Sequence, residues 1–240
     1  DRYVTACIPA ALNLVFESRL LEVMTVPLPD QDGSLQPVGA DTVLERSARA
    51  DALILGPGLG RSGPAAELAR QLTARAAIPL LLDADGLNAH AGALPALAGR
   101  GAPAVLTPHA GELARLLDSD SKSVGARRLH SARRAAQQSG AVVVLKGDDT
   151  IVASPSGITG VSRGGAAALA TAGTGDVLSG VSGAYLAKRM DPFHAACAAV
   201  LVHARAGQRA AGRLGPEGVI ASDVIAELPG ALEAARGMAT

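Results

Sequence analysis

Residues 53–60 read Leu-Ile-Leu-Gly-Pro-Gly-Leu-Gly, a short apolar run that passes into a glycine-rich loop. A helix is expected to begin near Gly63, so the stretch predicts a strand, a turn and a helix in succession. It does not match the dinucleotide fingerprint G-x-G-x-x-G, because Arg61 stands where the third glycine belongs. The loop can admit a ligand at the end of the strand, but taken alone it is better explained as an ordinary tight turn.

The same unit recurs on both sides of this stretch. Apolar runs predict strands over 3–8, 23–27, 52–55, 80–83, 104–107 and 142–145, with helices over 42–50, 63–74, 110–117 and 123–139. Beyond Lys146 we expect a β-hairpin over 150–154 and 158–161, then helices over 175–188, 192–212 and 222–236. This alternation predicts an α/β fold with a mostly parallel central sheet, helices on both faces and a single domain over 1–240.

Composition excludes several classes of function. The chain has 240 residues, is 48% hydrophobic and carries 22 basic against 22 acidic residues. A balanced charge argues against binding nucleic acid, and the lack of a long uninterrupted apolar run argues against a membrane span or a signal peptide. Cys7 and Cys197 lack the spacing of a metal site or a disulfide scaffold, so we expect inert thiols in a cytoplasmic protein.

The strongest chemical signal is residues 170–180, Ala-Thr-Ala-Gly-Thr-Gly-Asp-Val-Leu-Ser-Gly, at the start of a predicted helix. Helix N-termini expose unpaired N–H groups, so Gly173, Thr174 and Gly175 are candidates for an anion hole that holds phosphate. Asp176 is then placed to take a proton from an attacking hydroxyl group. The alternative is that Thr174 or Asp176 merely caps the helix, and the tetrapeptide does not decide between the two.

Polar residues also follow three predicted strands. Thr-Pro-His-Ala-Gly-Glu at 107–112 offers His109 as a hydrogen-bond partner for a substrate amide or ring, and Glu112 as a ligand that orients Mg²⁺ through water. Its alternative is the start of a helix formed by Thr107 and Glu112, with a structural histidine. The acidic turn at 83–88 places two carboxylates and an amide at the same edge of the sheet, and turn chemistry alone is the alternative explanation.

The third cluster is Lys146-Gly147-Asp148-Asp149-Thr150, where Lys146 can meet a phosphate as a point charge. The chain contains neither a Walker P-loop nor the G-x-S-x-G serine-hydrolase motif. All these clusters follow predicted strands or open a helix, so we expect them to meet at one edge of the sheet. The four arginines of the 123–139 helix, at positions 127, 128, 133 and 134, are expected on a solvated face.

Taken together, GPGLG at 56–60, DADGLN at 83–88, TPHAGE at 107–112, LKGDDT at 145–150 and ATAGTGDVLSG at 170–180 resemble the ADP/ATP-dependent (S)-NAD(P)H-hydrate dehydratases. These are ribokinase-like enzymes, and the resemblance runs from about Val4 to the end of the chain. It implies that the S form of hydrated NADH or NADPH is phosphorylated on its ring hydroxyl by ADP or ATP and then loses phosphate.

The resemblance also implies roles for particular residues. Asp176 is the base, and Gly173, Thr174 and Gly175 hold the phosphates. Lys146, Gly147, Asp148, Asp149, Thr150 and Gly175 contact the adenine nucleotide, whereas Gly58, His109 and Asp176 face the hydrated nicotinamide. A homo-oligomer, commonly a tetramer, is implied, as is fusion to or pairing with an NAD(P)H-hydrate epimerase.

The sequence departs from the family in two places. An earlier strand with a GS…GA segment is not found before Tyr3, so we expect either a domain that is incomplete at its amino end or an altered wall of the substrate pocket. Arg163-Gly164-Gly165 stands where members often have a Gly-Asn pair. Two other interpretations therefore stay open. One is a small-alcohol kinase of the same fold, which transfers phosphate without eliminating it. The other is a nucleotide-binding module without catalysis, which the missing strand suggests.

Overall fold

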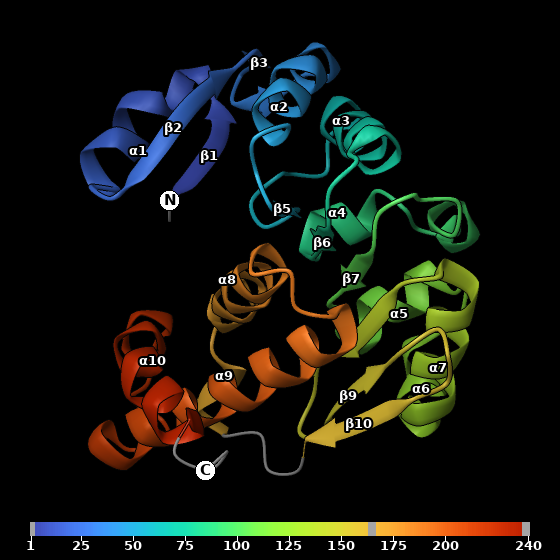
Figure 1. Ribbon diagram of the computed structural model, residues 1–240, viewed down its shortest axis with the longest axis vertical. Coiled ribbons are helices and arrows are strands. Elements are labelled where there is room, and N and C mark those ends of the chain that lie inside the picture. Colours follow the sequence, from blue (N-terminus) through green and yellow to red (C-terminus); the bar gives the residue numbers. More distant parts are fainter. Residues whose placement is uncertain (1–2, 163–166, 237–240) are drawn as a thin grey trace.

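A six-stranded sheet in the order β10-β9-β8-β7-β6-β5 forms the centre of the molecule (Figure 1). The computed structural model describes residues 3–162 and 167–236. Strands β5 (Leu53–Leu55), β6 (Leu80–Leu82), β7 (Ala104–Leu106) and β8 (Val142–Leu145) run parallel, and β9 (Thr150–Ala153) and β10 (Thr159–Ser162) add an antiparallel hairpin. The mostly parallel sheet and its terminal hairpin confirm the prediction from sequence.

Helices cover both faces of this sheet because successive strand residues point to opposite sides. Leu80 and Leu82 join the cluster built from α3 (Gly63–Arg75), α5 (Ala110–Leu116) and α7 (Arg128–Ser139). Leu81 joins the opposite cluster, with α8 (Thr174–Ala187) and α9 (Pro192–Leu214). The last helix, α10 (Ala221–Arg236), packs on α9 through a third cluster. No helix in 3–162 or 167–236 has the length and apolar character that crossing a membrane requires.

The first two predicted strands exist but do not join the central sheet. Strands β1 (Val4–Pro9) and β2 (Val23–Leu28) pair in parallel with each other over six residues, and α1 (Asn13–Arg19) connects them. The small hairpin of β3 (Asp30–Gln31) and β4 (Ser34–Leu35) and helix α2 (Ala40–Ser47) follow. These elements lie beside α3 at one end of the molecule (Figure 1). The expectation that all strands join one sheet was wrong. The backbone hydrogen bonds of β1 and β2 pair these two strands with each other, in a separate two-stranded sheet.

The helix predicted over 123–139 is broken into two. Helix α6 (Ser121–Ala126) ends at Arg127, whose backbone lies outside the helical region at φ −133° and ψ 46°. Gly125 weakens the helix just before this break. The break lets α7 start at Arg128, and the Arg128 side chain turns toward the loop after β8 instead of lying on a solvated face. The departure noted at residues 163–165 lies outside the described part of the chain.

Two buried histidines make the stability of this fold depend on pH. His90 is 5% exposed and His203 is 7% exposed. Desolvation by burial lowers the pKa of each from 6.5 to about 4, and Arg70 and Arg100 act in the same direction on His90. A hydrogen bond with the Thr174 backbone opposes the shift at His203 without reversing it. Both side chains are therefore neutral in the folded protein at neutral pH.

We expect the free energy of unfolding to fall as the pH drops from 6.5 toward 4. As the pH falls, the two histidines bind protons in the unfolded chain before they do so in the folded protein. Their contribution to stability is therefore complete above their pKa in the unfolded chain and is lost as the pH falls to their pKa in the folded protein. Each histidine contributes about 1.4 kcal/mol per pH unit within this window. Urea denaturation at several pH values should show a shallower dependence for His90→Gln, in which the amide can still reach Thr73. The exposed His130→Gln is the control, and an unchanged slope in His90→Gln would contradict the assignment.

Candidate active site

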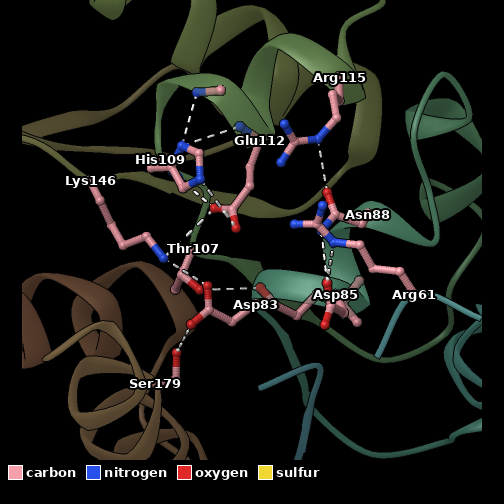
Figure 2. Close-up of polar contacts among 12 residues, drawn as sticks. Arg61, Asp83, Asp85, Asn88, Thr107, His109, Glu112, Arg115, Lys146 and Ser179 are labelled. Carbon is pink, nitrogen blue, oxygen red and sulfur yellow. Dashed lines mark hydrogen bonds and ion pairs between the residues drawn. The ribbon is translucent and has the colours of Figure 1, made fainter. Parts of the chain in front are cut away.

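The carboxyl ends of the parallel strands gather polar side chains around Asp83 (Figure 2). Asp83 follows β6 and is 1% exposed. Its Oδ1 accepts a hydrogen bond of 2.8 Å from Nζ of Lys146, which follows β8, and its Oδ2 accepts one of 2.7 Å from Oγ of Ser179 on α8. Lys146 Nζ also lies 3.8 Å from Glu112 Oε2. The predicted meeting of clusters at one edge of the sheet is thus observed for these loops.

The glycine-rich loop after β5 packs directly against the turn that carries Asp83. Gly56 has a φ of +130°, and a Cβ built there would lie 1.8 Å from the carbonyl oxygen of Asp83. Only glycine is compatible with such a close approach of two backbones. The loop is therefore more than an ordinary tight turn, because it fixes β5 and β6 relative to each other at the site. Gly58 lies farther along the loop with open space beside it.

Helix α8 begins at the predicted Gly-rich turn, and no side chain caps it. Its N-cap is Gly173, with a left-handed φ of +86°. The Thr174 hydroxyl group instead donates to the Leu169 carbonyl at 2.7 Å, and the Thr174 side chain is buried. The interpretation of Thr174 or Asp176 as a mere helix cap is therefore not supported.

The amide groups of this turn are only partly available to an anion. The N–H of Thr174 donates to the Thr171 carbonyl at 3.3 Å, and that of Asp176 donates to the Gly173 carbonyl at 3.1 Å. The amides of Gly173 and Gly175 have no hydrogen-bond partner within the described part of the chain. An anion hole at this turn would therefore use the amides of Gly173 and Gly175 but not that of Thr174. This is two of the three residues expected from sequence.

Asp176 lies next to these glycines and close to the Asp83–Lys146 pair. Its side chain is exposed, yet partial desolvation raises the pKa of its carboxyl group, and the negative charge of Asp83 raises it further. The positive charge of Lys146 opposes both effects. A carboxylate whose pKa is raised is a stronger base than an ordinary aspartate, which suits proton abstraction. Gly175 stands beside Lys146, since a Cβ built on it would lie 3.6 Å from Nζ.

His109 and Glu112 form a capping box at the start of α5. His109 Nδ1 accepts a hydrogen bond of 3.0 Å from the Gly111 amide, and Glu112 Oε2 accepts one of 2.8 Å from the His109 amide. The helix-start interpretation is therefore correct, but its cap is His109, whereas Thr107 is buried and bonded to the Leu82 carbonyl. Because Nδ1 accepts, the proton of the neutral ring lies on Nε2, which faces Oε1 of Glu112 at 3.6 Å.

The carboxylate of Glu112 does not belong to a metal cluster. No group of three histidine, cysteine, aspartate or glutamate side chains with metal-binding geometry occurs in the residues that the structure describes. Mg²⁺ commonly takes only one or two protein carboxylates together with phosphates and water. The donor set is therefore compatible with a magnesium ion that arrives with a nucleotide, and Glu112 would contact it through water.

The loop 146–150 is held in place by groups at both of its ends. The Lys146 amide donates to the Pro108 carbonyl at 2.9 Å, and the Thr150 hydroxyl group donates to the Gly147 carbonyl at 3.2 Å. Arg128 Nη2 donates to the Asp149 carbonyl at 2.9 Å. Asp148 and Asp149 themselves have exposed side chains. The loop is thus a fixed rim beside Lys146 with its acidic side chains outward.

Sequence reasoning missed Ser179 and Arg128. Ser179 had a recoverable signal, because it lies three residues after Asp176 and so shares a helix face with it. Arg128 had none, because its contacts with the loop after β8 depend on where α7 begins.

Comparison with known proteins agrees with this geometry. The sequence profile described as NAD(P)H-hydrate dehydratase matches residues 5–230. The chain belongs to this family. A bifunctional NAD(P)H-hydrate repair enzyme of Moorella thermoacetica is 37% identical over 227 residues, which are 94% of this chain and 43% of that protein. The ADP-dependent (S)-NAD(P)H-hydrate dehydratase of Xanthomonas campestris is 39% identical over 76% of this chain and 62% of its own.

Solved structures of the family share this fold. The ADP/ATP-dependent NAD(P)H-hydrate dehydratase of Bacillus subtilis, co-crystallised with ATP/Mg²⁺ and soaked with CoA, has a TM-score of 0.77 at 26% identity. The match covers 97% of this chain and 81% of that one. The chain spans about two fifths of the length of the first curated relatives that it matches.

We expect Lys146→Met to destabilise this dehydratase-family fold by about 2 to 3 kcal/mol in the absence of nucleotide, because it leaves the buried Asp83 carboxylate without its cation. This loss of stability is smaller than is usual when a fully buried ion pair is broken, because the Lys146 side chain is 22% exposed. Urea denaturation measures the change. Arg189→Gln breaks the exposed ion pair with Asp51 and should change stability by about 0.5 kcal/mol or less. Equal effects of the two substitutions would show that the Asp83–Lys146 pair does not support the fold.

Proposed function

We propose that this chain restores NADH and NADPH from the S forms of their hydrates, with ADP or ATP as the phosphoryl donor. The activity is that of a carbon–oxygen lyase. The observation that carries the proposal is the position of the Asp176 carboxylate beside the free amide of Gly175 and the Asp83–Lys146 pair. The names of the family and of its relatives support the choice of substrate.

In the first step, Asp176 takes the proton of the ring hydroxyl group while that oxygen attacks the terminal phosphorus of the nucleotide. A new P–O bond forms and the bond to the leaving nucleotide breaks, which gives AMP from ADP or ADP from ATP. The amides of Gly173 and Gly175 face the charge that grows on the phosphoryl oxygens. Mg²⁺, carried by the nucleotide phosphates and contacted through water by Glu112, would neutralise part of this charge.

In the second step, the phosphate leaves with the electrons of the C–O bond. The lone pair of the ring nitrogen moves toward the carbon that bore the oxygen, and loss of a proton from the adjacent carbon restores the double bond. Hydroxide is a far poorer leaving group than phosphate, which is why the nucleotide is consumed. His109 can orient the ring by donating from Nε2, and Gly58 leaves open space beside it.

The nucleotide is proposed to lie over the loop 146–150 and Gly175. The loop is anchored by Arg128 and by the Pro108 carbonyl, so it is preorganised for a ligand. Lys146 lies between Asp83 and Glu112 with its ammonium group at the edge of the site. It is placed to meet a phosphate oxygen as the nucleotide binds, together with the amides of Gly147, Asp148, Asp149 and Thr150.

The proposal extends to the setting of the enzyme. An epimerase that supplies the S form, fused or paired, fits the bifunctional names of several relatives. A homo-oligomer, with a tetramer as the assembly to test, and a cytoplasmic location belong to the same proposal. The free thiols of Cys7 and Cys197 agree with a reducing compartment.

We expect Asp176→Asn to lower turnover by about 100-fold or more, the loss expected when a general base is removed, with little change in nucleotide affinity. The assay follows recovery of absorbance in the reduced-nicotinamide band when hydrated NADH is mixed with protein, Mg²⁺ and ADP or ATP. Asp51→Asn, an identical change at an exposed surface site, is the control.

Equal turnover in Asp176→Asn and the parent chain would reject Asp176 as the base. Phosphorylated product without recovery of absorbance would indicate a small-alcohol kinase instead. Binding of nucleotide by the parent chain without any turnover would indicate a module without catalysis.

A further inference from the structure

A polar cleft opens beside the candidate active site, and neither step of the proposed reaction uses the residues that line it. It has a volume of about 260 Å³ and is lined by the loop after β5, by α4 (Ala84–Asn88) and by α5. Four polar side chains form its wall: Arg61, Asp85, Asn88 and Arg115. Figure 2 shows them adjacent to the group around Asp83, His109 and Glu112.

Each of the two arginines in this cleft donates a hydrogen bond to the described residues from only one of its three nitrogens, the Nε. Arg61 Nε donates to Asp85 Oδ1 at 3.0 Å, and Arg115 Nε donates to Asn88 Oδ1 at 2.9 Å. Asp85 and Asn88 are themselves joined by a hydrogen bond of 3.0 Å. The terminal nitrogens of the two guanidinium groups have no hydrogen-bond partner among the described residues. Two oriented guanidinium groups with free N–H pairs form an arrangement that recognises phosphate.

The charge of the cleft favours an anion. Burial acts to raise the pKa of Asp85, but hydrogen bonds from Arg61, Asn88 and the Gly60 amide outweigh it and hold that pKa below its ordinary value. Asp85 is therefore ionised at neutral pH and balances one of the two arginines. One net positive charge therefore remains among the side chains that line the cleft.

The position of the cleft separates it from the nucleotide loop. In the sheet order β8-β7-β6-β5, the loop 146–150 follows β8, whereas Arg61 and Asp85 follow β5 and β6 at the other edge. Arg115 lies three residues after Glu112 and so on the same side of α5. Gly58 and Gly60 both have open space where a side chain would stand, and Gly60 itself lines the cleft.

We propose that Arg61 and Arg115 bind the phosphate groups of the hydrated dinucleotide substrate. This inference rests on the proposed function and adds a subsite to it. With the hydrated ring at Asp176 and His109, the rest of the dinucleotide extends past Gly58 and Gly60 into this cleft. The bridging diphosphate is common to NADH and NADPH hydrates, whereas the 2′-phosphate occurs only in the second, so the two sources are separable by experiment.

The test compares Arg61→Gln, Arg115→Gln and the double variant with the parent chain. Three substrates are used: hydrated NADH, hydrated NADPH and the hydrate of reduced nicotinamide riboside, which carries no phosphate. We expect each single variant to raise KM for the dinucleotides about tenfold, as loss of a charged hydrogen bond does, with kcat and the KM for ADP nearly unchanged. The KM for the riboside hydrate should not move. Arg75→Gln, which removes an exposed arginine of α3 outside the cleft, is the matched control.

The outcomes are distinct. Equal losses for both dinucleotides identify the bridging diphosphate, and a loss for NADPH hydrate alone identifies the 2′-phosphate. Unchanged KM values, or equal losses for the riboside, overturn the subsite while leaving the proposed function standing. The side chain of Arg61 is 74% exposed, so its substitution is compatible with folding.

A binding measurement tests the cleft without turnover. Calorimetric titration of inorganic pyrophosphate, with ADP saturating, should show binding to the parent chain that is at least about tenfold weaker in the double variant. Equal binding by the two proteins rejects the subsite. Absence of turnover in the parent chain rejects the proposed function independently.

Discussion

The buried carboxylate of Asp83 is the constraint on which the site depends. A charge that is removed from water must be paired and hydrogen-bonded, and Asp83 meets this need with Lys146 and Ser179. These partners come from the end of β8 and from α8, so one side chain joins the ends of two strands to α8. The contact orients Lys146 and sets the register of α8, and with it the position of Asp176.

This arrangement divides the edge of the sheet into two sides. Beyond β8 lies the loop 146–150, which Arg128 and the Pro108 carbonyl hold in place and which is the proposed nucleotide rim. Beyond β6 and β5 lie the glycine-rich loop and the cleft with Arg61 and Arg115. Gly175, the neighbour of Asp176, lies beside Lys146. The proposed transfer from a phosphoryl donor to a dinucleotide would use both sides.

Several side chains combine a structural role with a chemical one. His109 caps α5 through Nδ1, and its Nε2 faces Glu112 Oε1 at 3.6 Å at the edge of the candidate site. Glu112 completes the cap and also lies near Lys146. Gly56 permits two backbones to touch and thereby fixes the loop that carries Gly58. The structural interpretation of these residues is therefore correct, and their contacts with ligands belong to the proposed function.

The sequence by itself determined the strands of the central sheet, the hairpin, most helix positions and the motifs that identify the family, because periodicity and turn chemistry are local properties. Only the tertiary structure decided that β1 and β2 form a separate sheet, that Thr174 turns inward and that Arg128 anchors a loop. It also decided the partners of Asp83, which lie 63 and 96 residues away in the chain. Contacts over such separations depend on strand order and helix register, which no local pattern of residues encodes.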